Sequence, residues 1–235
     1  MKLNNATVLI TGANRGIGLV FAREALARGA RKVYAGARDP DSVKLAGVEA
    51  IRLDVTRPDD IAAAARRATD VTLLINNAGI ATTGGFLADG SIEAARNQFE
   101  TNFFGPLQVS RAFAPILAAN GGGAILNVLS IASWISSPLL AVYGATKSAA
   151  WSLTNGLRHE LRAQKTQVLG MHMGFVDTDL TRGIDAAKST PEAVVRRALD
   201  ALEAGAEEVL ADEITQQVKR GLSIETPVYL QTLAR

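Results

Sequence analysis

Short runs of aliphatic and β-branched residues alternate along the chain with longer, alanine-rich amphipathic stretches. Short continuous apolar runs predict strands that are covered on both sides, and apolar residues recurring every three or four positions predict helices. The predicted strands are residues 7–10, 32–35, 50–53, 73–75, 124–129, 167–172 and 208–211. The predicted helices are residues 17–28, 58–67, 92–119, 143–163 and 191–204.

This sustained alternation of strand and helix predicts an α/β fold. Its sheet is mainly parallel and seven-stranded, with helices on both faces, because helical crossovers are what joins parallel strands. The chain shows no internal repeat and no linker-like segment, so we expect residues 1–235 to form a single domain.

Two breaks interrupt the pattern. Residues 120–123, Asn-Gly-Gly-Gly, read as a turn before the fifth strand. Residues 179–190 are polar and contain Gly183, and they end at Thr190, which can cap a helix that opens on Pro191. We interpret the second break as a candidate lid.

Composition excludes several kinds of protein. Hydrophobic residues make up 48% of the 235, and 25 basic against 23 acidic side chains leave a net charge of +2, which excludes wholesale disorder. No basic run concentrates that surplus, so we expect no nucleic-acid partner. The absence of cysteine excludes disulfides, thiolate metal sites and a cysteine nucleophile, and two histidines offer little for a metal centre, so no metal is expected.

The beginning of the sequence argues against export. The apolar stretch Thr7 to Ile10 is too short for the core of a signal peptide. No run approaches the roughly 18 apolar residues of a membrane helix, so no membrane partner is expected. We therefore expect an intracellular, cytoplasmic protein.

The first strand runs directly into a glycine-rich turn, residues 11–18, Thr-Gly-Ala-Asn-Arg-Gly-Ile-Gly. Glycines here let the backbone approach a ligand closely, and the helix that follows presents free N–H groups to a pyrophosphate. Such a turn alone is weak evidence, since purely structural turns share it. Its place between the first strand and first helix favours a dinucleotide site.

The end of the second strand distinguishes NAD from NADP. An acidic residue there binds the ribose hydroxyl of NAD, whereas NADP needs a cation for its additional phosphate. Here Arg38 comes first and Asp39 second, and Arg15 can bring another guanidinium. The alternative is that Arg38 and Asp39 form a solvated pair at the surface. We favour NADP(H).

Tyr143 and Lys147 lie four residues apart at the start of a predicted helix and so share one face. A phenol has a pKa of about 10, and a neighbouring ammonium lowers it toward the range useful for acid–base catalysis. A surface tyrosine packed on a lysine stem is the common alternative for an isolated pair.

Other polar residues lie where a substrate is expected. Ser130 ends the fifth strand, and ligands of open α/β sheets bind beyond the carboxyl ends of strands. Its hydroxyl can donate to a substrate carbonyl, with Ser133 as the local competitor. Asn102 lies inside a long predicted helix where Pro106 predicts a kink; a solvent-facing asparagine is the alternative reading.

Together these residues resemble the classical short-chain dehydrogenase/reductases. The motifs are Thr11-Gly12-x-x-x-Gly16-x-Gly18, Asn76-Asn77-Ala78-Gly79, Asn102, Ser130 and Tyr143-x-x-x-Lys147. The resemblance extends from Thr7 to about Thr181 and implies a doubly wound Rossmann-type fold.

The resemblance also implies roles. Tyr143 would be the catalytic acid–base, and Lys147 would lower its pKa and hold the nicotinamide ribose. Ser130 would orient the carbonyl, and Asn102 would anchor a water in a proton relay.

For the cofactor and the substrate, the resemblance and the residue pattern imply two sets of contacts. Those to NADP(H) would come from Gly12, Asn14, Arg15, Gly16, Ile17, Gly18, Arg38, Asp54, Val55, Asn77, Ala78, Gly79, Tyr143, Lys147, Val176 and Thr178. Those to the substrate would come from Ser130, Trp134, Leu140 and Tyr143.

The chain departs from the family in two places. Residues 173–178, Met-Gly-Phe-Val-Asp-Thr, stand where the family shows Pro-Gly-x-x-x-Thr, so a proline is missing. The lid is short, which suggests an open pocket that admits bulky carbonyl compounds. In relatives, the helices that contain Asn102 and Tyr143 build a dimer or tetramer, so we expect a homodimer or homotetramer.

These expectations lead to one main hypothesis and two alternatives. The first is an NADPH-dependent reductase that converts a ketone or aldehyde to an alcohol, reversibly. A non-catalytic dinucleotide-binding regulatory protein of the same fold is the second, and another α/β enzyme such as an epimerase or methyltransferase is the third. His159 is expected at the surface and His172 in the core.

Overall fold

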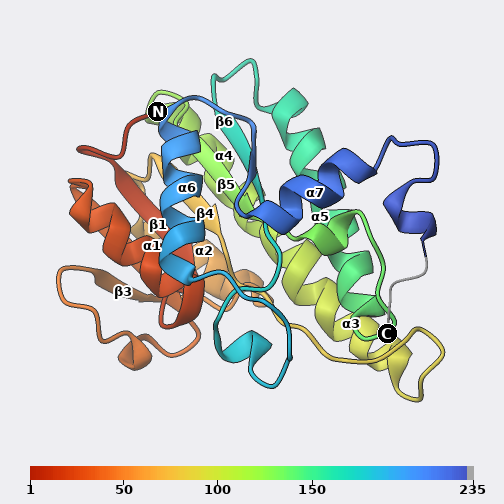
Figure 1. Cartoon of the computed structure of the whole chain (residues 1–235). Coiled ribbons are helices and arrows are strands. Elements are labelled where there is room, and N and C mark those ends of the chain that lie inside the picture. The colour runs from red at the N-terminus through yellow and green to blue at the C-terminus, as the bar shows by residue number, and fades with distance from the viewer. Residues whose placement is uncertain (232–235) are drawn as a thin grey trace.

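Seven parallel strands form one sheet in the computed structural model, which describes residues 1–231 (Figure 1). The strands are β1 (Thr7–Thr11), β2 (Lys32–Ala37), β3 (Glu49–Arg52), β4 (Leu73–Asn76), β5 (Ala124–Val128), β6 (Gln167–His172) and β7 (Glu208–Leu210). Their order is β3-β2-β1-β4-β5-β6-β7, so the chain reverses direction across the sheet between β1 and β4. A crevice at the carboxyl ends of the strands is the usual ligand site at such a reversal. Residues 232–235, the end of the expected domain, lie outside the described residues.

Two layers of helices cover the sheet. The helices are α1 (Gly16–Ala27), α2 (Pro58–Arg67), α3 (Ser91–Phe99), α4 (Gly105–Ala119), α5 (Ala141–Glu160), α6 (Pro191–Glu203) and α7 (Glu213–Gly221). One apolar cluster joins the sheet to α1 and α6, which lie side by side in front of it in Figure 1. A second cluster joins the opposite face to α2, α4 and α5.

The central strands show why their sequences are apolar throughout. Successive side chains of a strand point to opposite faces. Val8 and Ile10 of β1 therefore pack under α1 and α6, while Leu9 between them packs under α2 and α4. All three are fully buried. The predicted α/β fold with a parallel seven-stranded sheet and helices on both faces is confirmed.

The predicted helix 92–119 is not continuous. A π-helical turn, Glu100–Phe104, separates α3 from α4, and it lies before Pro106, where the kink was expected. Pro106 falls in the first turn of α4, where a missing N–H does no harm. The wider turn coincides with a close approach, because a Cβ at Gly105 would lie 2.8 Å from Cγ2 of Val55. The sequence pattern places Pro106 but contains no signal for this tertiary contact.

Helix ends were predicted with mixed success. Thr190 caps α6 as expected, since its side chain accepts a hydrogen bond from the Ala193 N–H at 3.2 Å and Pro191 opens the helix. Helix α5 begins at Ala141, two residues before the predicted start. No element was predicted for α7, whose cap is the side chain of Asp212.

Candidate active site

The glycine turn between β1 and α1 has a conformation that requires glycine. Gly12 and Gly16 have φ angles of +66° and +53°, and a Cβ at Gly18 would lie only 2.2 Å from the Gly12 carbonyl oxygen. No side chain caps the first turn of α1, so its N–H groups stay available to a ligand. The turn is therefore shaped to hold a phosphate group against the backbone.

The loops after β1 and β4 are joined by a compact set of hydrogen bonds. The Thr11 hydroxyl accepts from the N–H groups of Asn77 (3.0 Å) and Ala78 (2.9 Å). In return, Nδ2 of Asn77 donates to the carbonyl oxygens of Thr11 (2.9 Å) and Gly12 (3.1 Å). The Asn77 side chain thus holds the glycine turn in place, and the expected contacts of residues 77–79 with a cofactor stay a prediction.

The residues expected around the adenosine end lie along the ends of β2 and β3. Arg38 is exposed directly after β2, whereas the Asp39 carboxylate accepts from the Asp41 N–H at 3.1 Å and caps a short turn. Burial acts to raise the pKa of Asp54, but hydrogen bonds from Thr56 and the charge of Arg38 outweigh it and the pKa is lowered. Val55 is buried against α4.

Arg15 has a different neighbour from the one expected. Its Nη1 lies 3.2 Å from the Asp179 carboxylate of the candidate lid, and both side chains are about half exposed. Ion pairs this exposed contribute little stability. The idea that Arg15 and Arg38 meet at one phosphate stays a prediction.

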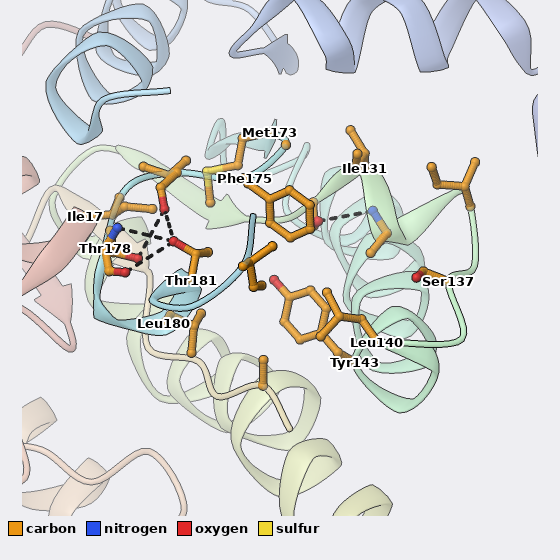
Figure 2. Close-up of a pocket in the computed structure, with 17 residues that line it drawn as sticks. Ile17, Ile131, Ser137, Leu140, Tyr143, Met173, Phe175, Thr178, Leu180 and Thr181 are labelled. Carbon is orange, nitrogen blue, oxygen red and sulfur yellow. Dashed lines mark hydrogen bonds between the residues drawn. The ribbon is translucent and has the colours of Figure 1, made fainter. Parts of the chain in front are cut away.

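Tyr143 and Ser130 come together at the carboxyl edge of the sheet. Tyr143 lies in the first turn of α5, and its hydroxyl points into the cavity shown in Figure 2. Ser130 follows β5 and opens the 3-10 turn Ile131–Ser133, where its Oγ accepts from the Ala132 N–H at 3.1 Å. Both side chains line the same cavity. Ser133, the competitor, is buried and does not line the cavity.

Lys147 lies one turn further along α5 and is 5% exposed. Its Nζ donates to the Val128 carbonyl oxygen at 2.8 Å and is 5.6 Å from the centroid of the Tyr143 ring. Burial lowers the pKa of Lys147 to about 8. Burial also raises the pKa of Tyr143 to about 12, against the opposing effect of the Ser130 hydrogen bond. Burial is thus the largest influence on the pKa of Tyr143, and a lowering of that pKa by Lys147 stays a prediction.

Asn102 is buried inside the π-helical turn, so it does not face solvent. Its Oδ1 accepts from the Ile80 N–H at 2.9 Å, and its Nδ2 donates to the Ile80 carbonyl oxygen (2.8 Å) and the Thr146 hydroxyl (3.0 Å). A Cβ at Gly79 would lie 3.4 Å from Oδ1 of Asn102 and 3.9 Å from Nζ of Lys147. The loop after β4 thus passes between these two side chains.

A cavity of about 250 Å³ lies beside Tyr143 and Ser130 (Figure 2). One end is bounded by Ile17, Val176 and Thr178, which were expected to contact the cofactor. Leu140, which was predicted to contact the substrate, also lines the cavity, as do three residues of the candidate lid 179–190, namely Leu180, Thr181 and Ile184. Lining residues that sequence reasoning did not single out include Ala81, Ile131, Ala132, Ile135 and Ser137. The sequence does not show whether an apolar residue in a loop lines a cavity or packs in the protein interior.

Trp134 is not among the residues that line the cavity, and a contact between Trp134 and a substrate stays a prediction. Its indole stacks on the His172 imidazole, with ring centroids 3.9 Å apart, and Lys219 lies over its ring. His172 is buried as expected, and its Nδ1 lies 3.2 Å from the Ser130 carbonyl oxygen. Trp134 and His172 therefore support the Ser130 segment from behind.

The loop after β6 is held by a residue that sequence reasoning missed. Asp212 accepts a hydrogen bond from the Gly174 N–H at 2.8 Å, while its other oxygen caps α7 through the N–H of Thr215 at 2.9 Å. This loop lacks the expected proline, and the carboxylate of Asp212 anchors it from a distant part of the chain. The sequence does contain a signal for Asp212 as a helix cap, because an aspartate directly before an amphipathic run is a typical N-cap.

Together, a doubly wound parallel sheet, a glycine turn after β1 and a Ser–Tyr–Lys group at the carboxyl edge define a Rossmann-type dinucleotide-binding fold. The family model of the short chain dehydrogenases matches residues 6–189. The chain belongs to this family of oxidoreductases.

Relatives support the assignment. Ketoacyl reductase HetN of Nostoc sp. is 30% identical over 231 residues, covering 90% of this chain and 80% of that protein. Dehydrogenase/reductase SDR family member 7B of Mus musculus is 32% identical over 195 residues, covering 76% of this chain and 60% of that protein. A short chain dehydrogenase from Burkholderia cenocepacia J2315, solved in complex with NADP, is 38% identical with a TM-score of 0.94, and the match covers 99% of this chain and 100% of that one.

Neither a metal-binding cluster nor a membrane-spanning helix is found among the described residues. No group of three histidine, aspartate or glutamate side chains within residues 1–231 is placed to hold a metal ion. Within the same residues, no helix has both the length and the apolar character needed to cross a bilayer.

Burial of His172 predicts a pH-dependent stability. Burial lowers its pKa from 6.5 to about 4, so the unfolded chain binds more protons between these values. The stabilising contribution is complete above pH 6.5 and is lost as the pH falls through about 4, by roughly 3 kcal/mol at most. In the His172→Asn variant, the free energy of unfolding, measured by denaturant titration, should fall less steeply over this range. An unchanged slope would contradict the prediction.

Proposed function

We propose that this chain is a single-domain, NADPH-dependent oxidoreductase that reduces a ketone or aldehyde to an alcohol, reversibly. The observation that carries the proposal is the position of the Tyr143 hydroxyl. It faces the cavity that Ser130 also lines and lies one helical turn from the buried Lys147. A substrate carbonyl oxygen placed against the two hydroxyls would accept a hydrogen bond from each.

The residues around the glycine turn fit a dinucleotide. A Cβ at Gly18 would collide with the Gly12 carbonyl oxygen, so glycine lets the turn close tightly before α1, whose first N–H groups would face the pyrophosphate. Arg38, exposed directly after β2, would bind the 2′-phosphate. The Asp39 carboxylate already accepts a hydrogen bond from the Asp41 N–H as the cap of a short turn. The NADP complex of the 38% identical Burkholderia protein supports NADP over NAD. When bound, NADPH supplies the hydride for the carbonyl carbon.

The electrostatics of Tyr143 favour its role as proton donor. With a pKa near 12, the phenol is protonated at neutral pH and can give its proton to the developing alkoxide, a stronger base. Lys147, with a pKa near 8, carries its charge at neutral pH and would stabilise the phenolate left behind. Asn102, buried beside Gly79 and Thr146, would anchor the water of a proton relay through Lys147.

Two further features belong to the proposal. We expect a homodimer or homotetramer, and the exposed aromatic ring of Phe104, just before α4, is consistent with an interface on that helix. We also expect the protein to work in the cytoplasm on a small molecule, without nucleic acid or membrane.

Replacing Tyr143 by phenylalanine tests the proton donor. The Tyr143→Phe variant should lose roughly 10²- to 10⁴-fold in kcat, the usual contribution of general acid catalysis, while it still binds NADPH. Oxidation of NADPH followed at 340 nm with a panel of aldehydes and ketones measures turnover, and quenching or enhancement of NADPH fluorescence measures binding. Tyr229→Phe, which changes an exposed tyrosine outside the cavity, is the control. Full activity of Tyr143→Phe would refute the mechanism, and a wild type that binds NADPH without any turnover would favour a regulatory protein.

Replacing Arg38 by aspartate tests the cofactor. Loss of a charge-assisted contact to the 2′-phosphate, together with the introduced repulsion, should reduce kcat/KM for NADPH relative to NADH by roughly 10- to 100-fold. Steady-state rates with each cofactor give this ratio. Arg96→Asp, which changes an exposed arginine of α3, should leave the ratio as it is. A ratio that does not move in Arg38→Asp would overturn the assignment of NADP.

A further inference from the structure

The side chains that line the cavity are uncharged. Among the described residues around it there is no Asp, Glu, Lys, Arg or His. The polar ones are Ser130, Ser137, Tyr143, Thr178 and Thr181. Every other lining side chain is apolar or belongs to glycine. The polarity of the cavity therefore depends on which of these five hydroxyls are already hydrogen-bonded within the protein.

Two of the hydroxyls are committed to the protein. Thr181 donates to the Val176 carbonyl oxygen at 2.6 Å, and Thr178 lies 3.4 Å from the same oxygen (Figure 2). Ser137 lies apart from this group on the loop before α5, where it accepts from the Leu139 N–H at 3.3 Å. The donors that remain at the reacting end are Ser130 and Tyr143, which the proposed function uses for the carbonyl oxygen.

The candidate lid adds apolar surface and keeps its charges elsewhere. Leu180 and Ile184 reach the cavity, and Leu180 is still 45% exposed, so an apolar substrate would cover surface that water now contacts. Among the charged residues of the lid, Asp185 is exposed and does not line the cavity, and three others have partners. Asp179 pairs with Arg15 and Arg182, and Nζ of Lys188 donates to the Thr181 carbonyl oxygen at 2.9 Å.

The size of the cavity limits the substrate. Of its roughly 250 Å³, the end at Ile17, Val176 and Thr178 is reserved for the cofactor in the proposed function. An apolar cavity of roughly 150 Å³ accepts benzene, so the remaining space suits a substituent of about one ring. A carboxylate or phosphate placed there would lose its hydration without gaining a partner, whereas each buried methylene is favourable.

We propose that the substrate is an uncharged ketone or aldehyde whose substituents are hydrocarbon, of about the size of one ring, and that Leu180 and Ile184 of the lid determine this selectivity. The inference rests on the proposed function, because it assigns the substrate of the same site. It excludes hydroxy acids, sugar phosphates and other anionic carbonyl compounds as preferred substrates.

The test compares substrates that differ in charge alone. Methyl 4-acetylbenzoate is the methyl ester of 4-acetylbenzoate, and only the second is anionic; their rates of reduction by borohydride give the intrinsic difference in carbonyl reactivity, by which the enzymatic ratio is divided. With the purified full chain and NADPH, kcat/KM should be at least 100-fold higher for the ester. Along the series from 2-butanone to 2-hexanone, kcat/KM should rise about fourfold for each added methylene. Equal or better turnover of the carboxylate, or a flat series, overturns the inference.

A lid variant tests the assignment of the selectivity. Ile184→Arg places a cation at the cavity wall, so it should raise kcat/KM for 4-acetylbenzoate at least tenfold and lower that for 2-hexanone. Ile92→Arg, which changes an exposed isoleucine of α3 outside the cavity, should do neither. NADPH binding and circular dichroism check that both variants are folded. A selectivity unchanged in a folded Ile184→Arg variant refutes the role of the lid.

Failure of the inference and failure of the proposed function look different. If anionic carbonyl compounds are reduced preferentially and the activity disappears in Tyr143→Phe, the function stands and the substrate class is wrong. If no carbonyl compound in the panel oxidises NADPH, the proposed function falls and the substrate class with it.

Discussion

The hydroxyl of Thr11 connects the two loops on which the whole site depends. By accepting the N–H groups of Asn77 and Ala78, it holds the turn after β1 against the turn after β4. Asn77 completes the connection by donating to the Thr11 and Gly12 carbonyl oxygens. From there the β4 loop continues through Gly79, which lies between Asn102 and Lys147. The cradle for a phosphate is therefore placed relative to Asn102 and Lys147 by side-chain–backbone hydrogen bonds and by the close approach at Gly79.

Burial then decides the charge of the two central groups, and it acts on them in opposite directions. It raises the pKa of Tyr143 and lowers that of Lys147, because in each case the ionised form is the one that loses hydration. The result at neutral pH is a neutral phenol next to an ammonium group held by the Val128 carbonyl. In the proposed function, this pair of states would allow Tyr143 to give a proton to a substrate.

Much of this could be predicted from the sequence, and the exceptions have physical causes. Continuous apolar strands and their order of appearance predicted the sheet, since burial on both faces leaves a direct mark on composition. Gly12, Gly16 and Gly18 were recognisable because their positions tolerate no other side chain. The π-helical turn at Asn102 was not, because it depends on contacts with Val55 and Ile80 from distant loops. Trp134 lay in the right segment but faces His172, and the sequence does not show which side of a loop an indole takes. The anchoring of Gly174 by Asp212 likewise joins residues far apart in the chain.

The most direct test of the account follows the hydride itself. A ketone such as 2-hexanone is reduced in ordinary water with NADPH that carries deuterium at the transferring position of nicotinamide C4, and the alcohol is analysed by mass spectrometry and NMR. The account predicts one deuterium on the former carbonyl carbon, and none there when unlabelled NADPH is used in D₂O, because the solvent-derived proton goes to oxygen. An alcohol whose carbon takes its hydrogen from solvent would contradict hydride transfer from NADPH, and with it the function proposed for Tyr143.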